Sequence, residues 1–278
     1  MNPFLPSPHA NPAECAPPNR APARHVGLHW PSLPSQCAVC RSWPSAPVCA
    51  ACVARFTAWP TRRCQTCAVG LPPSLLNLEM TSDTAPGPAP DRCGECTRHP
   101  PPLDLACAAV AYGYPWSSLV AQFKFGEQPG WAAFFASLLL TQRAAAVALA
   151  ALGPEDWLVP LPLSAERLAQ RGFNQAWELT QALAAASANA GRTDARLLLR
   201  IAHTRPQSQL RRDQRQANVA QAFAVDPLRA TTLAGRRVVL VDDVMTSGAS
   251  VFSAARVLRE AGAAHVSALV FARTEEPT

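Results

Sequence analysis

The chain has 278 residues and a formal net charge of +6, which comes almost entirely from arginine because Lys124 is its only lysine. Apolar residues make up 49% of the sequence and charged residues 16%, so the chain can bury a core, and its basicity permits contact with phosphates without requiring it. No apolar run reaches the roughly 20 residues of a membrane span, and the start, MNPFLPSPHA, lacks the features of a secretory signal, so we expect a cytoplasmic protein without membrane insertion.

The sequence divides into three parts of different composition. Residues 1–34 are rich in proline and show no helical or strand periodicity, which predicts a disordered tail. Residues 35–104 hold four cysteine pairs, and a stretch of proline and small polar residues at 70–91 predicts a loop insertion between them. Residues 105–275 alternate apolar strands with helices, which predicts an α/β domain with a parallel sheet flanked by helices.

Eight of the ten cysteines form four C-x-x-C knuckles, Cys37/Cys40, Cys49/Cys52, Cys64/Cys67 and Cys93/Cys96. Two knuckles supply the four ligands of a tetrahedral zinc ion, so a zinc ribbon with one or two structural ions is expected. In a reducing compartment this pattern indicates metal rather than disulfides, and a redox dithiol is the weaker alternative because it normally begins a helix beside a strand. Sequential pairing of the knuckles is the simplest arrangement, and crossed pairing stays open. Cys15 and Cys107 are interpreted as incidental.

The hydrophobic pattern of residues 105–275 predicts the elements of the α/β domain. Strands are expected at 106–114, 156–162, 236–243 and 265–273. A long buried helix is expected at 131–152, a second helix in the later part of 164–190, and an amphipathic helix at 250–263. The Val- and Leu-rich strands lack alternation, which is typical of strands covered on both faces.

Residues 238–250, VVLVDDVMTSGAS, carry the strongest functional signal. An apolar strand ends in two carboxylates at the edge of a parallel sheet where α/β folds bind ligands. Backbone N–H groups at the following helix start and the hydroxyls of Thr246 and Ser247 predict a cradle for a phosphate monoester, which Gly248 lets approach closely. Asp242 and Asp243 are expected to accept hydrogen bonds from ribose hydroxyls and to help hold hydrated Mg²⁺.

Together with several other motifs, this segment resembles the ComF family, a branch of the type I phosphoribosyltransferases associated with bacterial competence and DNA uptake. The order of the motifs along the chain is part of the resemblance. The resemblance covers roughly residues 35–275 and rests also on the knuckles, FKFGE (123–127), VPLP (159–162), RLAQRGFNQA (167–176) and RPQSQLRRDQRQANVAQAF (205–223). It implies the type I phosphoribosyltransferase fold and a site for phosphoribosyl pyrophosphate (PRPP) with Mg²⁺. The implied PRPP-binding residues are Asp242, Asp243, Val244, Met245, Thr246, Ser247, Gly248, Ala249 and Ser250.

The resemblance also implies contacts to the leaving pyrophosphate. The segment 205–223 resembles the flexible loop that closes over PRPP, and its arginines would neutralise pyrophosphate or instead follow a nucleic-acid backbone. A solvated helix face is the alternative for Arg167 and Arg171, and a surface position is the alternative for Lys124. The candidate contacts are Lys124, Arg167, Arg171, Asn174, Gln175, Arg205, Arg211, Arg212 and Arg215.

Two functions of different class stay open from the sequence. As an enzyme, the chain would transfer the phosphoribosyl group of PRPP to an unidentified acceptor, and no residue is assigned as base or nucleophile. As a binding protein, it would contact single-stranded DNA or a competence helicase through the ribbon and the arginine-rich loop, with a regulatory or vestigial PRPP site. The intact motif at 238–250 favours the enzyme, and the ribbon, which transfer does not require, favours binding. A nucleotide- or sugar-salvage transferase is the third alternative.

Overall fold

The computed structural model describes residues 35–43, 45–57, 62–71, 91–187, 191–201 and 222–275. The tail predicted at 1–34 lies outside these residues, as do the interior of the insertion predicted at 70–91 and residues 205–221 of the arginine-rich segment.

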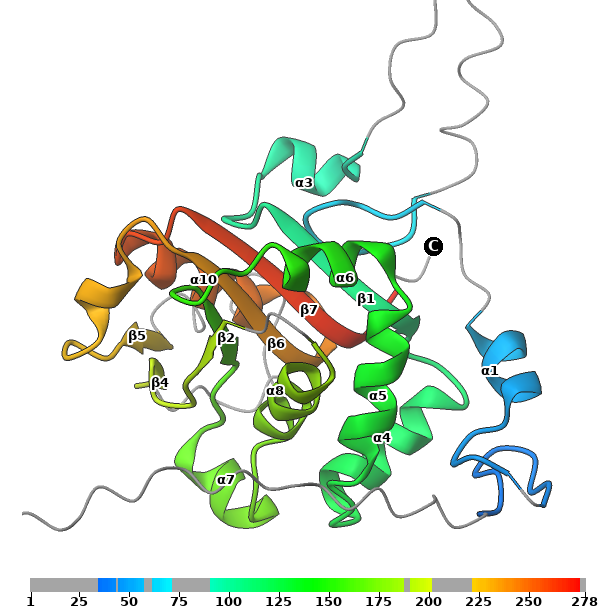
Figure 1. Cartoon of the computed structure of the whole chain (residues 1–278). Coiled ribbons are helices and arrows are strands. Elements are labelled where there is room, and N and C mark those ends of the chain that lie inside the picture. Colours follow the sequence, from blue (N-terminus) through cyan, green and yellow to red (C-terminus); the bar gives the residue numbers. More distant parts are fainter. Residues whose placement is uncertain are drawn as a thin grey trace, which may run out of the picture.

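A five-stranded parallel sheet with the order β1-β7-β6-β2-β3 forms the centre of the molecule (Figure 1). The two longest strands, β6 and β7, pair from Arg237↔His265 to Met245↔Arg273, so their carboxyl ends lie level. The strands are β1 (Leu105–Ala111), β2 (Trp157–Pro160), β3 (Arg192–Thr193), β6 (Arg237–Met245) and β7 (His265–Arg273).

Helices cover both faces of this sheet, as the unbroken apolar strands predict. On one face α4 (Trp116–Phe125), α5 (Trp131–Leu140) and α8 (Gln175–Ala186) share an apolar cluster with Val239 and Val241 of β6. On the other face α10 (Ala249–Glu260) packs against Val238 and Leu240, beside the antiparallel hairpin of β4 (Leu198–Arg200) and β5 (Phe223–Val225). The fold is therefore a three-layered α/β domain with apolar packing on each side of the sheet.

The helix predicted at 131–152 is wrong as a single element. Two helices stand there, α5 and α6 (Arg143–Ala150), and they are bent by 95° relative to each other. The break lies at Gln142, whose backbone is extended (φ −79°, ψ 118°), while the Thr141 hydroxyl donates to the Leu138 carbonyl at 2.7 Å. No proline or glycine interrupts residues 131–152, so the bend reflects packing: α5 covers β7, and α6 turns over the amino ends of the strands.

The remaining predicted elements differ mainly at their ends. In the segment predicted at 164–190, the described residues 164–187 form two helices, α7 (Ala165–Arg171) and α8, because Gly172 adopts a left-handed conformation (φ 76°) that ends α7. The strands predicted at 106–114 and 156–162 end earlier, at Ala111 and Pro160, whereas β6 continues past its acidic pair to Met245. The last strand occupies 265–273 as predicted.

The described residues of the cysteine-rich part form two short helices that lie on different sides of the domain. In Figure 1, α1 (Ala50–Phe56) stands beside α4 and α5, and α3 (Gly94–Arg98) lies near the start of β1. Accordingly Cys37 and Cys52 belong to the apolar cluster of α5, and Cys64, Cys67 and Cys96 to that of α10. Within the described residues, only α5 and α6 taken together have the length and apolarity of a membrane span, and no single helix does.

Truncation of the core residue Phe135 tests this packing. Its side chain is fully buried in α5 and stacks on Phe271 of β7, with ring centroids 3.8 Å apart. We expect Phe135→Ala to lower the free energy of unfolding by about 3–5 kcal/mol, because it removes apolar contacts and leaves a cavity. Urea denaturation followed by circular dichroism measures this. Val147→Ala on α6, where the side chain is 58% exposed, should change it by less than about 0.5 kcal/mol, and equal losses would contradict the packing.

Candidate functional site

A pocket of about 270 Å³ lies at the carboxyl edge of the sheet. Elements far apart in sequence meet there: the ends of β1, β2 and β6, the starts of α7 and α10, the end of α4, and the hairpin strand β4. The lining residues are Tyr112, Lys124, Leu161, Pro162, Leu163, Arg167, Arg171, Arg200, Asp242, Asp243, Val244, Met245, Thr246, Ser247, Gly248, Ala249, Ser250 and Val251. The whole segment 242–250 thus lines one pocket with four basic side chains.

The turn from β6 into α10 has the shape of an anion cradle. Gly248 caps α10 with a left-handed conformation (φ 82°), and its carbonyl accepts the first helical bond, from the Phe252 N–H at 2.8 Å. A φ of 82° is rarely adopted by residues with a side chain, so a substitution here would be strained, and a Cβ atom would also displace the ends of the Phe252 and Met245 side chains. The N–H groups of the first helical turn have no acceptor within a helix, and a phosphate oxygen is a natural one at this positive end of the helix dipole.

The acidic pair places two carboxyl groups beside a single lysine. Asp243 is 6% exposed, and its Oδ2 atom pairs with Nζ of Lys124 at 2.9 Å. Oδ1 of Asp242 accepts a hydrogen bond from the Asp243 N–H at 2.9 Å. Burial, followed by the neighbouring Asp243 carboxylate, raises the pKa of Asp242 to about 8 against the opposing effect of Lys124. Two adjacent carboxylates with one lysine form an oxygen-rich site whose charge suits a divalent cation.

Three arginines stand around this pair. Arg167 and Arg171 come from α7, and Arg200 comes from the end of β4. Burial lowers the pKa of Arg171, although Asp243 and Asp242 oppose the shift, and its guanidinium lies 4.9 Å from the centroid of the Phe125 ring. With Lys124, the lining holds four cationic and two anionic side chains. Its excess positive charge favours a polyanionic ligand.

The other candidate contacts lie elsewhere. Asn174 and Gln175 are not among the lining residues. Asn174 caps α8, since its Oδ1 accepts from the Ala176 N–H at 3.0 Å, and its Nδ2 donates to the Leu161 carbonyl at 3.2 Å. Asn174 therefore holds the loop after β2, which does line the pocket. Arg205, Arg211, Arg212 and Arg215 lie outside the described residues.

Sequence reasoning missed three residues near the pocket: Tyr112, Arg200 and Arg273. Tyr112 directly follows β1 and is 41% exposed. Arg273 ends β7, is 4% exposed, and donates to the carbonyl oxygens of Met245 and Thr246 in the loop. The gathering of carboxyl ends in a parallel sheet would have indicated Tyr112 and Arg273. The position of Arg200 depends on the hairpin, which the sequence pattern did not indicate.

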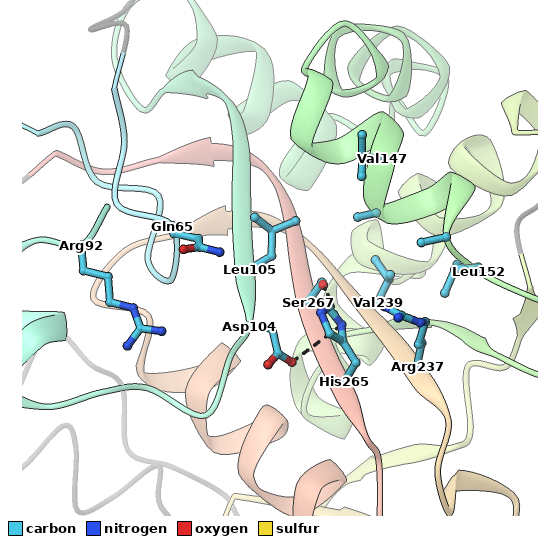
Figure 2. A pocket seen from close by; sticks show the side chains of 12 residues that line it. Gln65, Arg92, Asp104, Leu105, Val147, Leu152, Arg237, Val239, His265 and Ser267 are labelled. Atoms are coloured by element: carbon cyan, nitrogen blue, oxygen red, sulfur yellow. Dashed lines mark hydrogen bonds and ion pairs between the residues drawn. The ribbon is translucent and has the colours of Figure 1, made fainter. Parts of the chain in front are cut away.

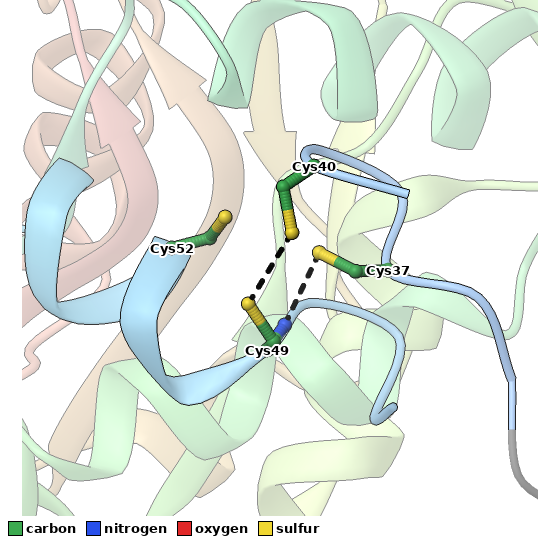
Figure 3. Close-up of side chains that lie close together, drawn as sticks. All are labelled: Cys37, Cys40, Cys49 and Cys52. Atoms are coloured by element: carbon green, nitrogen blue, oxygen red, sulfur yellow. Dashed lines mark hydrogen bonds between the residues drawn. The ribbon is translucent and has the colours of Figure 1, made fainter. Parts of the chain in front are cut away.

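The eight knuckle cysteines form two clusters with sequential pairing, one of Cys37, Cys40, Cys49 and Cys52 and the other of Cys64, Cys67, Cys93 and Cys96. The four Sγ atoms of each cluster all lie within 4.8 Å of one another. Figure 3 shows the first cluster, in which the Cys40 and Cys49 sulfurs are 3.6 Å apart, and the Cys67 and Cys93 sulfurs of the second are 3.7 Å apart. Four thiolates at about 2.3 Å from a tetrahedral zinc ion are about 3.8 Å from one another. Both clusters therefore fit zinc as they stand.

The protein surroundings favour ionisation of some thiols in each cluster and oppose it for others. Burial opposes the ionisation of Cys37, but backbone N–H groups, including that of Cys49 at 3.3 Å, lower its pKa to about 6. In the second cluster the Cys67 side chain lowers the pKa of Cys64. Burial raises the pKa of Cys52 to about 12 and that of Cys96 to about 11, so these thiols would lose their protons when the metal binds rather than before.

A second hollow, of about 390 Å³, lies at the opposite, amino edge of the sheet (Figure 2). Its walls are largely apolar, with Val147 and Leu152 on the side of α6. Its one carboxylate, Asp104, accepts a hydrogen bond from the Val266 N–H at 2.8 Å and also pairs with Arg259. Nδ1 of His265 lies 3.7 Å from the same carboxylate. These polar groups hold strand ends and a helix together, so the hollow is not the candidate site.

Comparisons with known proteins agree with this geometry. Residues 195–278 match the phosphoribosyl transferase domain family. The chain is 31% identical to the DNA utilization protein YhgH of Salmonella typhimurium over 249 residues, which cover 87% of this chain and 99% of that protein. It is 30% identical to the competence protein F of Haemophilus influenzae over 65% of this chain and 78% of that one. To the competence protein ComFC of Bacillus subtilis it is 34% identical, over 42% and 44% of the two chains.

Metal analysis of the purified full-length chain tests the two cysteine clusters. We expect two zinc ions per chain, because each of the two clusters offers four thiolates. Cys49→Ser/Cys52→Ser and Cys93→Ser/Cys96→Ser should each remove one ion. Cys107→Ala is the matched control, since Cys107 belongs to neither cluster, and it should retain both. Elemental analysis by mass spectrometry measures the content, and an unchanged zinc content in either double variant would contradict that site.

Proposed function

The chain belongs to the ComF family, and we propose that it binds PRPP with Mg²⁺ in the pocket at 242–250 and transfers its phosphoribosyl group to an acceptor during DNA uptake. One observation carries this proposal. The glycine-capped turn, the acidic pair and four basic side chains line a single pocket at the carboxyl edge of the sheet. The named roles of the relatives in competence and DNA utilization support the link to DNA uptake.

The turn would hold the 5-phosphate of PRPP. Thr246 and Ser247 are exposed at the pocket and offer hydroxyl donors, while Ser250 and Val251 offer N–H groups from the first turn of α10. Gly248 accommodates the left-handed conformation of the turn (φ 82°) without strain. A phosphate at this position would replace water at donors that lack helical partners.

Asp242 and Asp243 would accept hydrogen bonds from the ribose hydroxyls and share the magnesium ion. Their oxygens fit the preference of Mg²⁺ for carboxylates and phosphates, and a bound cation would take the place of the proton that the raised pKa of Asp242 retains near neutral pH. When bound, the ion would offset the negative charge of pyrophosphate. Lys124, by pairing with Asp243 at 2.9 Å, orients that carboxylate.

The arginines would stabilise the leaving group. In the transfer, the bond from the anomeric carbon to pyrophosphate breaks, pyrophosphate leaves with the electron pair, and a bond from the acceptor forms at the same carbon. Arg167, Arg171 and Arg200 face the same pocket as the acidic pair, so developing charge on pyrophosphate would meet fixed cations. Positioning and charge stabilisation of this kind are the main means of catalysis when no nucleophile or base is evident.

Calorimetric titration of PRPP with Mg²⁺ tests the site. We expect binding by the wild-type chain and at least about 100-fold weaker binding by Asp242→Asn/Asp243→Asn, because two charged hydrogen-bond acceptors are lost. Glu260→Gln, at the far end of α10, is the control and should bind like the wild type. A folded, zinc-loaded wild-type chain that does not bind PRPP would refute the proposal.

A second candidate function, binding of single-stranded DNA, is favoured by exposed aromatic and basic side chains beside the pocket. Phe125 is 71% exposed and lies under Arg171, while Tyr112 and Tyr114 are 41% and 69% exposed. Bases stack on such rings, and arginines contact the phosphates between them.

Fluorescence anisotropy with a labelled single-stranded oligonucleotide tests this function. If the surface binds DNA, affinity should fall by about 10-fold or more between 50 and 200 mM salt, because bound phosphates release counterions. Phe125→Ala should weaken binding by about 5- to 100-fold through loss of one stacking partner. Leu228→Ala replaces a side chain that is 88% exposed on another element and should have no effect. Equal affinities for all three proteins would exclude Phe125 as a stacking residue.

A further inference from the structure

We infer that the metal cluster of Cys64, Cys67, Cys93 and Cys96 holds the phosphate-binding turn in shape, and that Arg273 transmits this effect as a positioning residue. The zinc ribbon would thus stabilise the ligand site, and the effect of this coupling on PRPP binding rests on the function proposed above. It starts from a contact that joins the two regions directly.

Arg273 reaches both regions from the end of β7. Its side chain is 4% exposed. Nε donates to the carbonyl oxygen of Cys67 at 2.8 Å, and Nη1 donates to the carbonyl oxygens of Met245, at 3.3 Å, and Thr246. One rigid, planar guanidinium therefore bridges a metal knuckle and the first residues of the turn.

The bridge made by the Arg273 guanidinium depends on a folded knuckle for two reasons, the position of its carbonyl acceptors and the charge of the metal cluster. A buried guanidinium needs acceptors for its donors, and the acceptors here are backbone carbonyls, whose positions depend on the fold of each segment. Four thiolates around one divalent ion also leave a net charge of −2 at the knuckle, which favours a nearby cation. Without the metal, the carbonyl of Cys67 and this charge are no longer fixed beside Arg273.

A second tie joins the same knuckle to the chain just beyond Arg273. Oε2 of Glu275 accepts a hydrogen bond from the Gly70 N–H at 3.0 Å, and Oε1 of Glu275 lies 3.4 Å from Nη2 of Arg63. The Thr274 N–H in turn donates to the Met245 carbonyl at 3.0 Å. The segment 273–275 is thus held between the knuckle at 63–70 and the phosphate-binding turn.

The first cluster has a different attachment and serves as an internal control. Its helix α1 is tied to α4, where Nε1 of Trp116 donates to the Phe56 carbonyl at 2.9 Å, and Cys37 and Cys52 pack in the cluster of α5. Loss of metal there removes a zinc ion without touching the contacts of Arg273. Coupling through Arg273 therefore predicts that the two clusters differ in their effect on the turn.

Hydrogen exchange in the full-length protein tests the coupling without a ligand. Two amides report on the turn: Phe252, which donates to the Gly248 carbonyl, and Thr274, which donates to the Met245 carbonyl. We expect their exchange to be about 10-fold faster in Cys93→Ser/Cys96→Ser and in Arg273→Met, because a charge-assisted bridge is lost. In Cys49→Ser/Cys52→Ser it should equal that of the wild type.

Zinc content separates positioning from folding of the ribbon. Arg273→Met should keep both zinc ions while its turn exchanges faster. Arg273→Gln, whose single uncharged donor nitrogen cannot replace the two nitrogens of the bridge, is the second variant if the first is unfolded. Wild-type exchange rates in Cys93→Ser/Cys96→Ser and in the folded Arg273 variant would overturn the inference. Equal acceleration by loss of either metal cluster would do so as well.

The reciprocal measurement distinguishes this inference from the proposed function. Linkage requires that a ligand of the turn also raise the affinity for the metal, so PRPP with Mg²⁺ should reduce the equilibrium release of zinc from the second cluster to a competing chelator several-fold in the wild type and not in Arg273→Met. If PRPP does not bind while exchange still responds to the second cluster alone, the proposed function fails and the coupling stands. Binding of PRPP with no effect on zinc release would refute the coupling alone.

Discussion

The parallel pairing of β6 with β7 determines where every part of the site lies. Both strands have nine residues, and the register ends with Met245 beside Arg273, while Ala111 of β1 pairs with Arg273 from the other side. The carboxyl ends of the three strands therefore meet at one edge. A slip of one residue would exchange the two buried faces of β6, so the packing of α5 and α10 enforces the register that aligns the acidic pair with the turn.

The two cysteine clusters would stabilise a part of the chain whose described segments are too small to form a hydrophobic core. The described segments between residues 35 and 100 contain only two helices, of seven and five residues, which cannot form a core of their own. Four thiolates around a metal would supply the missing stabilisation, and each knuckle pair then docks on a different side of the α/β domain. Only the second is close to the turn, which explains how a ribbon can matter to a site that it does not line.

Sequence patterns predicted the parts of this protein that depend on neighbours along the chain. The strand at 265–273 and the turn at 246–248 follow from local residue types, and the spacing of the knuckles predicted the two clusters of four cysteines. The break at Gln142 and the hairpin that carries Arg200 could not be predicted, because packing across the sheet decides both. Asn174 illustrates the same limit: its residue type suits an anion contact equally well, yet the structure uses it to cap α8.

The difference between the two hollows shows why the smaller one binds ligand in our proposal. At the amino edge, the only carboxylate of the lining, that of Asp104, pairs with Arg259 and accepts a backbone hydrogen bond, so this carboxylate serves the fold. At the carboxyl edge, the cationic side chains outnumber the acidic ones, and a helix start presents N–H groups to the same space. Holding these like charges and unpaired N–H groups in one pocket costs free energy unless a ligand pairs with them. An anion pairs with the basic side chains and the N–H groups, and a cation bound to that anion pairs with the acidic residues. A phosphorylated ribose bound with magnesium supplies both.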